Sequence, residues 1–233
     1  MNIFSYESKV SQVLMFVADL CILNLCFILC CLPIFTIGAA QAALYSGIRT
    51  LQDPEDDTSP AKAFFKAFKE GFGSITIAWL LFFVLEILLG LALWNASVLR
   101  LEGSANAPYW ISIVGLVVVL LLHAQIPLFH ARFSCTAFQL LRNSFFLVIA
   151  HPLRSVLVAA LIWAPLATLT TPAFLFISLV FILLYYGVVF LLNFNIMKKP
   201  FKTLIDHYNE THDEDGIAII PPIEEEEEED SDI

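Results

Sequence analysis

Two acidic residues, Asp19 and Glu86, lie within long apolar stretches where an acid is costly. An acid inside a membrane-spanning helix costs ~2.5–3.5 kcal/mol on insertion scales, so it needs a protein partner, water or a proton. At 1.5 Å per residue, we expect Asp19 about 10 Å and Glu86 about 12 Å from the outer ends of their helices. Similar depths would allow the two carboxyl groups to meet and share a proton, because no lysine or arginine lies at that depth.

Two interpretations of these acids remain open. In the first, they form a binding site for protons or a polar solute inside the membrane. In the second, each is a protonated acid that hydrogen-bonds between helices, or faces water near the outer end.

A second polar group is expected toward the inner end of a later apolar stretch. His123 and His130 are seven residues apart and share a helix face. Without further ligands nearby this spacing is weak evidence for a metal, so structural hydrogen bonding is the expected role. The candidate intramembrane polar site therefore comprises Asp19, Asn24, Glu86, His123 and Gln125. Few polar residues separate the outer acids from the inner group, which mildly disfavours a transport path.

The sequence lacks the common motifs for catalysis and cofactor binding. It contains no Walker A motif, no His-Glu-x-x-His, no Gly-x-Ser-x-Gly and no paired-cysteine zinc pattern. We expect no enzyme activity, no cofactor, no bound metal and no nucleic-acid partner. The cysteines of the first apolar stretch are expected to be packing residues.

Composition indicates that lipid is the solvent for these residues. The chain has 233 residues, of which 59% are hydrophobic, against ~45–50% in an ordinary soluble domain. We predict an all-α, polytopic membrane protein with about five spans and additional amphipathic helices. The expected spans are about 12–32, 73–94, 108–129, 151–169 and 172–196, within a transmembrane domain over residues 1–200.

The first span should end at Leu32–Pro33, because proline cannot continue the helical hydrogen-bond ladder. Thr36 is a candidate cap for a second helix, and Gly38 allows a turn or close packing. That second helix, 39–51, is expected to leave along the membrane face. Whether it enters the bilayer stays open.

A basic amphipathic helix is predicted over 60–71, before the second span. Phe64, Phe65 and Phe68 fall on one side, with lysines around the other. Such a helix lies in the membrane interface or packs on the protein's own cytoplasmic face. A similar pattern recurs 81 residues later, around Phe145 and Phe146, which suggests either a duplication or a chance echo. A polar loop over 95–107 is expected after the second span.

Charge distribution predicts the orientation. The connections after the first and third spans and the C-terminal flank hold most of the lysines and arginines, so they are expected in the cytoplasm. The N-terminus is then outside and the C-terminus inside. The net charge of −10 belongs to the C-terminal end of the chain. Residues 201–233 include six consecutive glutamates and are predicted to form a largely disordered tail, solvated or docked on a basic partner.

Several residues resemble those of a known family. The set runs Leu32, Pro33, Thr36, Ile37 and Gly38, followed by Phe64, Phe65 and Phe68. This pattern is similar to the YesL-like family of bacterial integral membrane proteins of unknown function. The resemblance covers about residues 12–199 and implies a bacterial plasma-membrane location. It assigns no catalytic residues.

The resemblance also implies a role. Genes of the YesL-like family are often found among carbohydrate-uptake genes, including those of sugar ABC importers. We therefore expect an accessory or interaction subunit linked to carbohydrate uptake, with the lipid bilayer and importer permease subunits as partners. The alternative is a small-solute transporter that uses the acidic pair.

Overall fold

The computed structural model describes residues 9–53, 57–101, 106–133, 137–168 and 185–203, and their regular structure is helical. The all-α prediction is confirmed. The elements are α1 (Lys9–Cys30), a 3-10 turn η1 (Ile34–Thr36), α2 (Ile37–Gln52), α3 (Pro60–Leu101), α4 (Ala107–His130), α5 (Ala137–Ala150), α6 (Pro152–Thr168), and a helix over 185–203.

Three of the described helices are long and apolar enough to cross a membrane: Ser11–Cys30, Pro60–Arg100 and Ala107–His130. Helices α5 and α6 form a pair bent by 113°, which gives a fourth span if the pair counts as one. The predicted fifth span, 172–196, lies mostly outside the described residues, although 185–196 are helical. The number five therefore stays a prediction.

The chain turns between α1 and α2 as the proline predicts, but Thr36 acts differently from expectation. Its hydroxyl lies 2.5 Å from the Cys30 carbonyl oxygen and 2.6 Å from that of Pro33. It makes no side-chain cap bond to α2. The predicted cap is therefore wrong: Thr36 satisfies carbonyls left at the end of α1 and in the turn.

Helix α2 forms part of the core and packs against α1, α3 and α4. Its expected place along the membrane face stays a prediction. A Cβ at Gly38 would lie 2.5 Å from Trp79 on α3, and one at Gly47 would lie 2.5 Å from Leu23 on α1. The missing side chains therefore allow both neighbouring helices to approach α2 closely.

Helix α3 corrects two boundaries. The helix predicted over 60–71 and the span predicted over 73–94 form one helix of 42 residues, about 63 Å long at 1.5 Å per residue. The predicted loop over 95–107 is wrong in its first part, because the helix continues to Leu101. A glycine in a helix interior costs only ~1 kcal/mol, and the packed neighbours of Gly71 offset that cost.

The phenylalanine side of the 60–71 segment packs mainly on the protein itself. Phe64 is fully buried and Phe68 packs against the core, whereas Phe65 is 52% exposed. This favours packing on the chain over a position in the membrane interface. The 81-residue echo does not correspond to a repeated shape: its first copy lies in straight α3, and its second crosses the 113° bend before Pro152.

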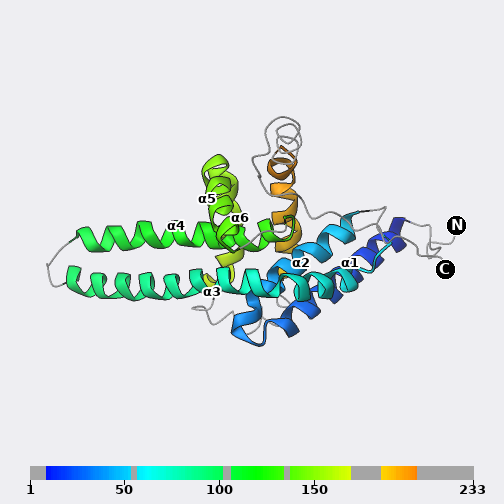
Figure 1. The fold of residues 1–233 in the computed structure, drawn as a ribbon, viewed down its shortest axis with the longest axis horizontal. Coiled ribbons are helices and arrows are strands. Elements are labelled where there is room, and N and C mark those ends of the chain that lie inside the picture. Colours follow the sequence, from blue (N-terminus) through cyan, green and yellow to red (C-terminus); the bar gives the residue numbers. More distant parts are fainter. Residues whose placement is uncertain (1–8, 54–56, 102–105, 134–136, 169–184, 204–233) are drawn as a thin grey trace.

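Helices α3 and α4 run antiparallel as a long hairpin, and the end of this hairpin away from α1 and α2 projects beyond the other helices (Figure 1). Arg100 lies 4.5 Å from the centre of the Tyr109 ring and 5.6 Å from that of Trp110. These cation–π contacts join the two helices at that end.

The helix over 185–203, orange in Figure 1, packs against α1, α2 and the end of α4. The Phe190 ring stacks on Tyr45 with centroids 4.4 Å apart. Phe201 is fully buried and contacts Phe129 and Phe133. Phe201 therefore belongs to the packed core. The predicted division of the chain after residue 200 stays a prediction, because residues 204–233 lie outside the described residues.

Candidate intramembrane polar site

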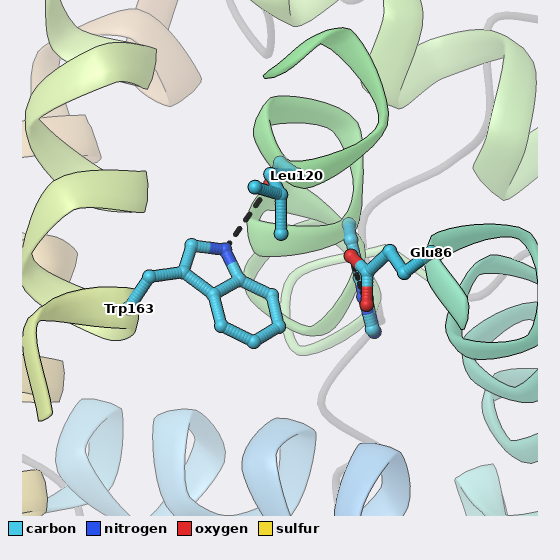
Figure 2. Close-up of polar contacts among 4 residues, drawn as sticks. Glu86, Leu120 and Trp163 are labelled. Atoms are coloured by element: carbon cyan, nitrogen blue, oxygen red, sulfur yellow. Dashed lines mark hydrogen bonds and ion pairs between the residues drawn. The ribbon is translucent and has the colours of Figure 1, made fainter. Parts of the chain in front are cut away.

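A glutamate and a histidine meet between α3 and α4. Glu86 Oε1 lies 2.7 Å from His123 Nδ1, and the two side chains are only 11% and 3% exposed. Figure 2 shows Glu86 extending from α3 toward α4, with Trp163 approaching α4 from α6. The pair is thus enclosed by three helices within the apolar part of the structure.

Aromatic rings form the walls of this site. The His123 ring has Trp79 at 5.2 Å, Phe82 at 5.9 Å and Trp163 at 5.6 Å between ring centres. The Trp163 indole Nε1 donates a hydrogen bond to the Leu120 carbonyl oxygen at 3.4 Å (Figure 2). These rings hold the imidazole in place and exclude water from one side of the pair.

The aromatic walls were not predicted, although the sequence carries a signal for part of them. Trp79, Phe82 and Glu86 are spaced i, i+3 and i+7, so they lie on one face of α3. Trp79 also connects the site to the motif residue Gly38, whose missing side chain leaves room for the indole. Trp163 could not have been assigned in this way, because it comes from a helix distant in sequence.

The predicted separation of outer and inner polar groups is wrong. Glu86 lies 15 residues before the end of α3 and His123 lies 16 residues after the start of α4, about 22 Å and about 24 Å from the connecting loop. Because α3 and α4 run antiparallel and the two residues lie at nearly the same distance from the connecting loop, their side chains meet. The sequence-based depth of Glu86 was too small because it placed the end of the helix at Trp94.

Glu86 and His123 together can hold a single exchangeable proton. With that proton the pair is net neutral, either as carboxylic acid and imidazole or as carboxylate and imidazolium. Without it, the pair carries one negative charge in a region of low dielectric, which is costly. The arrangement can therefore bind and release a proton, or simply fasten α3 to α4.

The second ring nitrogen of His123, Nε2, offers a further hydrogen-bonding position at this site. Among the described residues, His123 Nε2 is buried and has no hydrogen-bond partner. It is a donor or an acceptor according to which form of the pair is present. A polar group that reached it would be held directly next to the proton-binding pair.

Asp19 does not take part in this site. A Cβ at Gly47 would lie close to both Leu23 and the Pro60 carbonyl oxygen, so α1 meets α3 at its first residue. Glu86 lies 26 residues further along α3, about 39 Å away at 1.5 Å per residue. The predicted meeting of Asp19 and Glu86 is therefore wrong: α1 is displaced along the axis of α3, so depths counted separately in each helix do not align.

The other candidate residues are dispersed. Asn24 is fully buried, and its Oδ1 accepts a hydrogen bond from the Gly187 backbone N–H at 3.0 Å. Gln125 is also fully buried, and neither atom of its amide has a partner within the described part of the chain. Gln125 lies two residues after His123, so its side chain points roughly 200° around α4 from that of His123.

His130 has a separate role from His123. Its Nε2 lies 2.9 Å from the Ser74 hydroxyl, and its ring fills the space left by Gly71 on α3. Between them, the described residues bring together no group of three histidine, cysteine or acidic side chains that could hold a metal. His130 and Ser74 form a second polar contact between α3 and α4.

Comparison with known families gives one match. Residues 20–93 match a family described as "Protein of unknown function, DUF624". The match covers 74 of the 233 residues, from α1 into α3, and so includes Gly38, Trp79 and Glu86 but stops before His123. The YesL-like proteins belong to this broader family, and the narrower resemblance stays a prediction. No curated protein and no solved structure matches the chain.

Proposed function

We propose that this protein is an integral membrane subunit that binds other membrane proteins, and that it serves carbohydrate uptake as a partner of importer permeases. It acts without catalytic residues of its own. On this proposal it lies in a bacterial plasma membrane, with its N-terminus outside and its C-terminus in the cytoplasm. The link to carbohydrate uptake is supported by the resemblance to the YesL-like family alone.

One observation carries the interaction role: the chain covers little of its long apolar helix α3. Only 17% of the apolar stretch of α3 is buried by the rest of the chain, compared with 44% in α4. Large apolar side chains on the projecting part of the hairpin are exposed, including Leu88 at 58% and Val114 at 61%. A surface of this kind is suited to lipid and to the helices of a membrane partner.

Polar contacts also support an interaction role over a transport role. The contacts of Asn24 with Gly187, Glu86 with His123 and Ser74 with His130 each join two helices. Each therefore stabilises the arrangement of helices in the bilayer. None forms part of a row of polar groups leading across the hairpin.

Site-specific photo-crosslinking in living cells tests the interaction role. A photoreactive amino acid is placed at Leu88 and at Val114, with exposed Leu14 of α1 as the control position. We expect a defined protein adduct from both hairpin positions, identified by mass spectrometry as a permease subunit of a sugar importer. Reaction with lipid alone at all three positions would refute the proposal.

A second candidate function is a proton-coupled transporter, and the Glu86–His123 pair is the observation that favours it. A buried pair of an acid and an imidazole, whose second ring nitrogen has no partner among the described residues, is suited to couple solute movement to a proton. Purified protein in liposomes that contain a pH-sensitive dye tests this function. Solute-dependent acidification should vanish in Glu86→Gln and persist in Glu70→Gln, which changes an exposed acid on the same helix. A wild-type protein that moves no protons excludes this candidate.

A further inference from the structure

Arg132 lies just beyond the end of α4, in an environment that is unusual for a cation. Its Cζ lies 4.3 Å from the centre of the Phe194 ring and 5.1 Å from that of Phe201, both on the helix over 185–203. Its Nε is buried and has no hydrogen-bond partner among the described residues. Cation–π contacts compensate part of the lost hydration, but they leave the N–H donor unsatisfied.

The charge of Arg132 is not balanced by a carboxylate within the described part of the chain. Burial, followed by the positive charge of Arg49 on α2, lowers the pKa of Arg132 from 12.5 to about 10. The side chain is therefore still a cation at neutral pH. A partly buried cation that is repelled by a second cation is costly unless an anion offsets it.

The helix over 185–203 also carries a cation, Lys198, close in sequence to the two rings. Lys198 comes four residues after Phe194 and three before Phe201, so it shares their side of the helix, and it is exposed. Arg49 has contacts of its own. Arg132 is therefore the cation on which this site is centred, and Arg49 adds to the positive potential around it.

The position of this cluster indicates the class of anion. Arginine presents a planar set of N–H donors that matches the oxygens of a phosphate group, and it keeps its charge when partly buried. Arg132 comes two residues after the last residue of an apolar helix, where a headgroup layer begins. Basic pockets between helices at this level are typical binding sites for anionic lipid headgroups.

We propose that Arg132, covered by Phe194 and Phe201, is the central residue of a binding site for a phosphate group at the end of α4. An anionic phospholipid is the source that the position favours. A soluble phosphorylated compound would offer the same chemistry. The site is separate from the Glu86–His123 pair and does not depend on the proposed interaction role.

Lipid binding to the full-length protein in a neutral detergent tests the proposal. The probe is phosphatidylglycerol with a fluorophore on its acyl chain, and unlabelled phosphatidylcholine is the competitor. We expect Arg132→Gln to weaken binding by about tenfold or more, as expected for loss of charge-assisted hydrogen bonds. Arg132→Lys should bind at an intermediate level, because it keeps the charge but loses the planar donors.

Arg142→Gln is the matched control, since it removes an exposed arginine from α5 and so the same net charge. We expect its affinity to equal that of the wild type. A second arm uses inorganic phosphate and glycerol 3-phosphate as competitors. If these displace the probe at concentrations near that of the lipid, and do so only when Arg132 is present, the source is a soluble phosphate compound.

A measurement on the wild type covers the case in which Arg132 variants fail to fold. A ligand that binds the folded state raises the melting temperature. Phosphatidylglycerol should therefore stabilise the wild type and Arg142→Gln more than phosphatidylcholine does. Equal stabilisation by the two lipids without any effect of the soluble phosphates, or equal loss of binding in Arg132→Gln and Arg142→Gln, would overturn the proposal.

Discussion

Replacing His123 by leucine removes the partner of Glu86 and leaves an acid inside the apolar part of the structure. The cost of an acid at the centre of a spanning helix is ~2.5–3.5 kcal/mol on insertion scales, so His123→Leu should lower the free energy of unfolding by about 3 kcal/mol. Glu86→Leu leaves a buried imidazole nitrogen unpaired, which costs ~1–3 kcal/mol. Independent effects would therefore add to about 4–6 kcal/mol in the double variant.

The structure predicts a different result for the double variant. Because Glu86 and His123 satisfy each other, removing both leaves no unpaired polar group at this contact, and two leucines fit an environment of aromatic rings. We expect Glu86→Leu/His123→Leu to lie within about 1 kcal/mol of the wild type, which is a coupling energy of several kcal/mol. Steric trapping in bicelles measures these free energies without extracting the protein from lipid.

A double variant as unstable as the sum of the two single variants would refute the reasoning, because it would show that the residues do not interact. A single variant His123→Gln provides a further control. Its amide can still hydrogen-bond to Glu86, so its loss of stability should be smaller than that of His123→Leu.

Two further predictions concern helix contacts. Gly38→Ala should lower stability by ~1–3 kcal/mol, because the new Cβ would lie 2.5 Å from Trp79, whereas Gly90→Ala on α3 meets nothing within 4 Å and should be neutral or stabilising. Thermal melting in detergent measures both changes, and equal effects would contradict the predicted clash. Asn24→Leu leaves the Gly187 N–H unpaired and should cost ~1–3 kcal/mol. The same melting assay compares this variant with the wild type, and a harmless Asn24→Leu would contradict the prediction.

Length and apolar content were sufficient to predict two of the apolar helices closely. The spans expected over 12–32 and 108–129 correspond closely to α1 and α4, because a long uninterrupted apolar run has few alternatives. The break after Leu32 was also predicted, since proline cannot donate the hydrogen bond that the helix requires.

Helix α2 shows where hydropathy fails as a guide. The sequence predicted a helix that leaves along the membrane face after the bend at Leu32–Pro33, and left open whether it enters the bilayer. Its alanines and glycines have little hydrophobicity. These residues are buried because small side chains allow α1 and α3 to approach closely, and this depends on residues such as Leu23 and Trp79 in other helices. Hydropathy measures transfer from water to lipid and does not report how well two helices fit together.

Of the five candidate residues the structure brings two together, Glu86 and His123, and this pairing was not predicted. Glu86 and His123 were both candidates, but the ion-pair partners expected for an acid were lysine and arginine. Treating Trp94 as the end of a span then placed Glu86 too near the outer side, although Trp94 lies within α3 and is 73% exposed. The exposure of an aromatic residue at a membrane surface does not require the helix to end there.

The position of the Glu86–His123 pair depends on features spread over the sequence. Gly38 leaves room for Trp79, the Trp79 ring contacts His123, and His123 meets Glu86. The family match covers residues 20–93, so it includes Gly38 and Trp79 together with the acid. The histidine lies outside the match, at a depth fixed by the antiparallel pairing of α3 with α4. The methyl group added in Gly38→Ala would crowd Trp79 Cβ, Cγ and Cδ1, and phenylalanine keeps all three atoms. If Gly38 exists to position Trp79 against His123, then Trp79→Ala, which removes Cγ and Cδ1, should partly relieve the instability of Gly38→Ala, whereas Trp79→Phe should not. Equal instability of Gly38→Ala with tryptophan or alanine at position 79 would show that Gly38 has another role in α2.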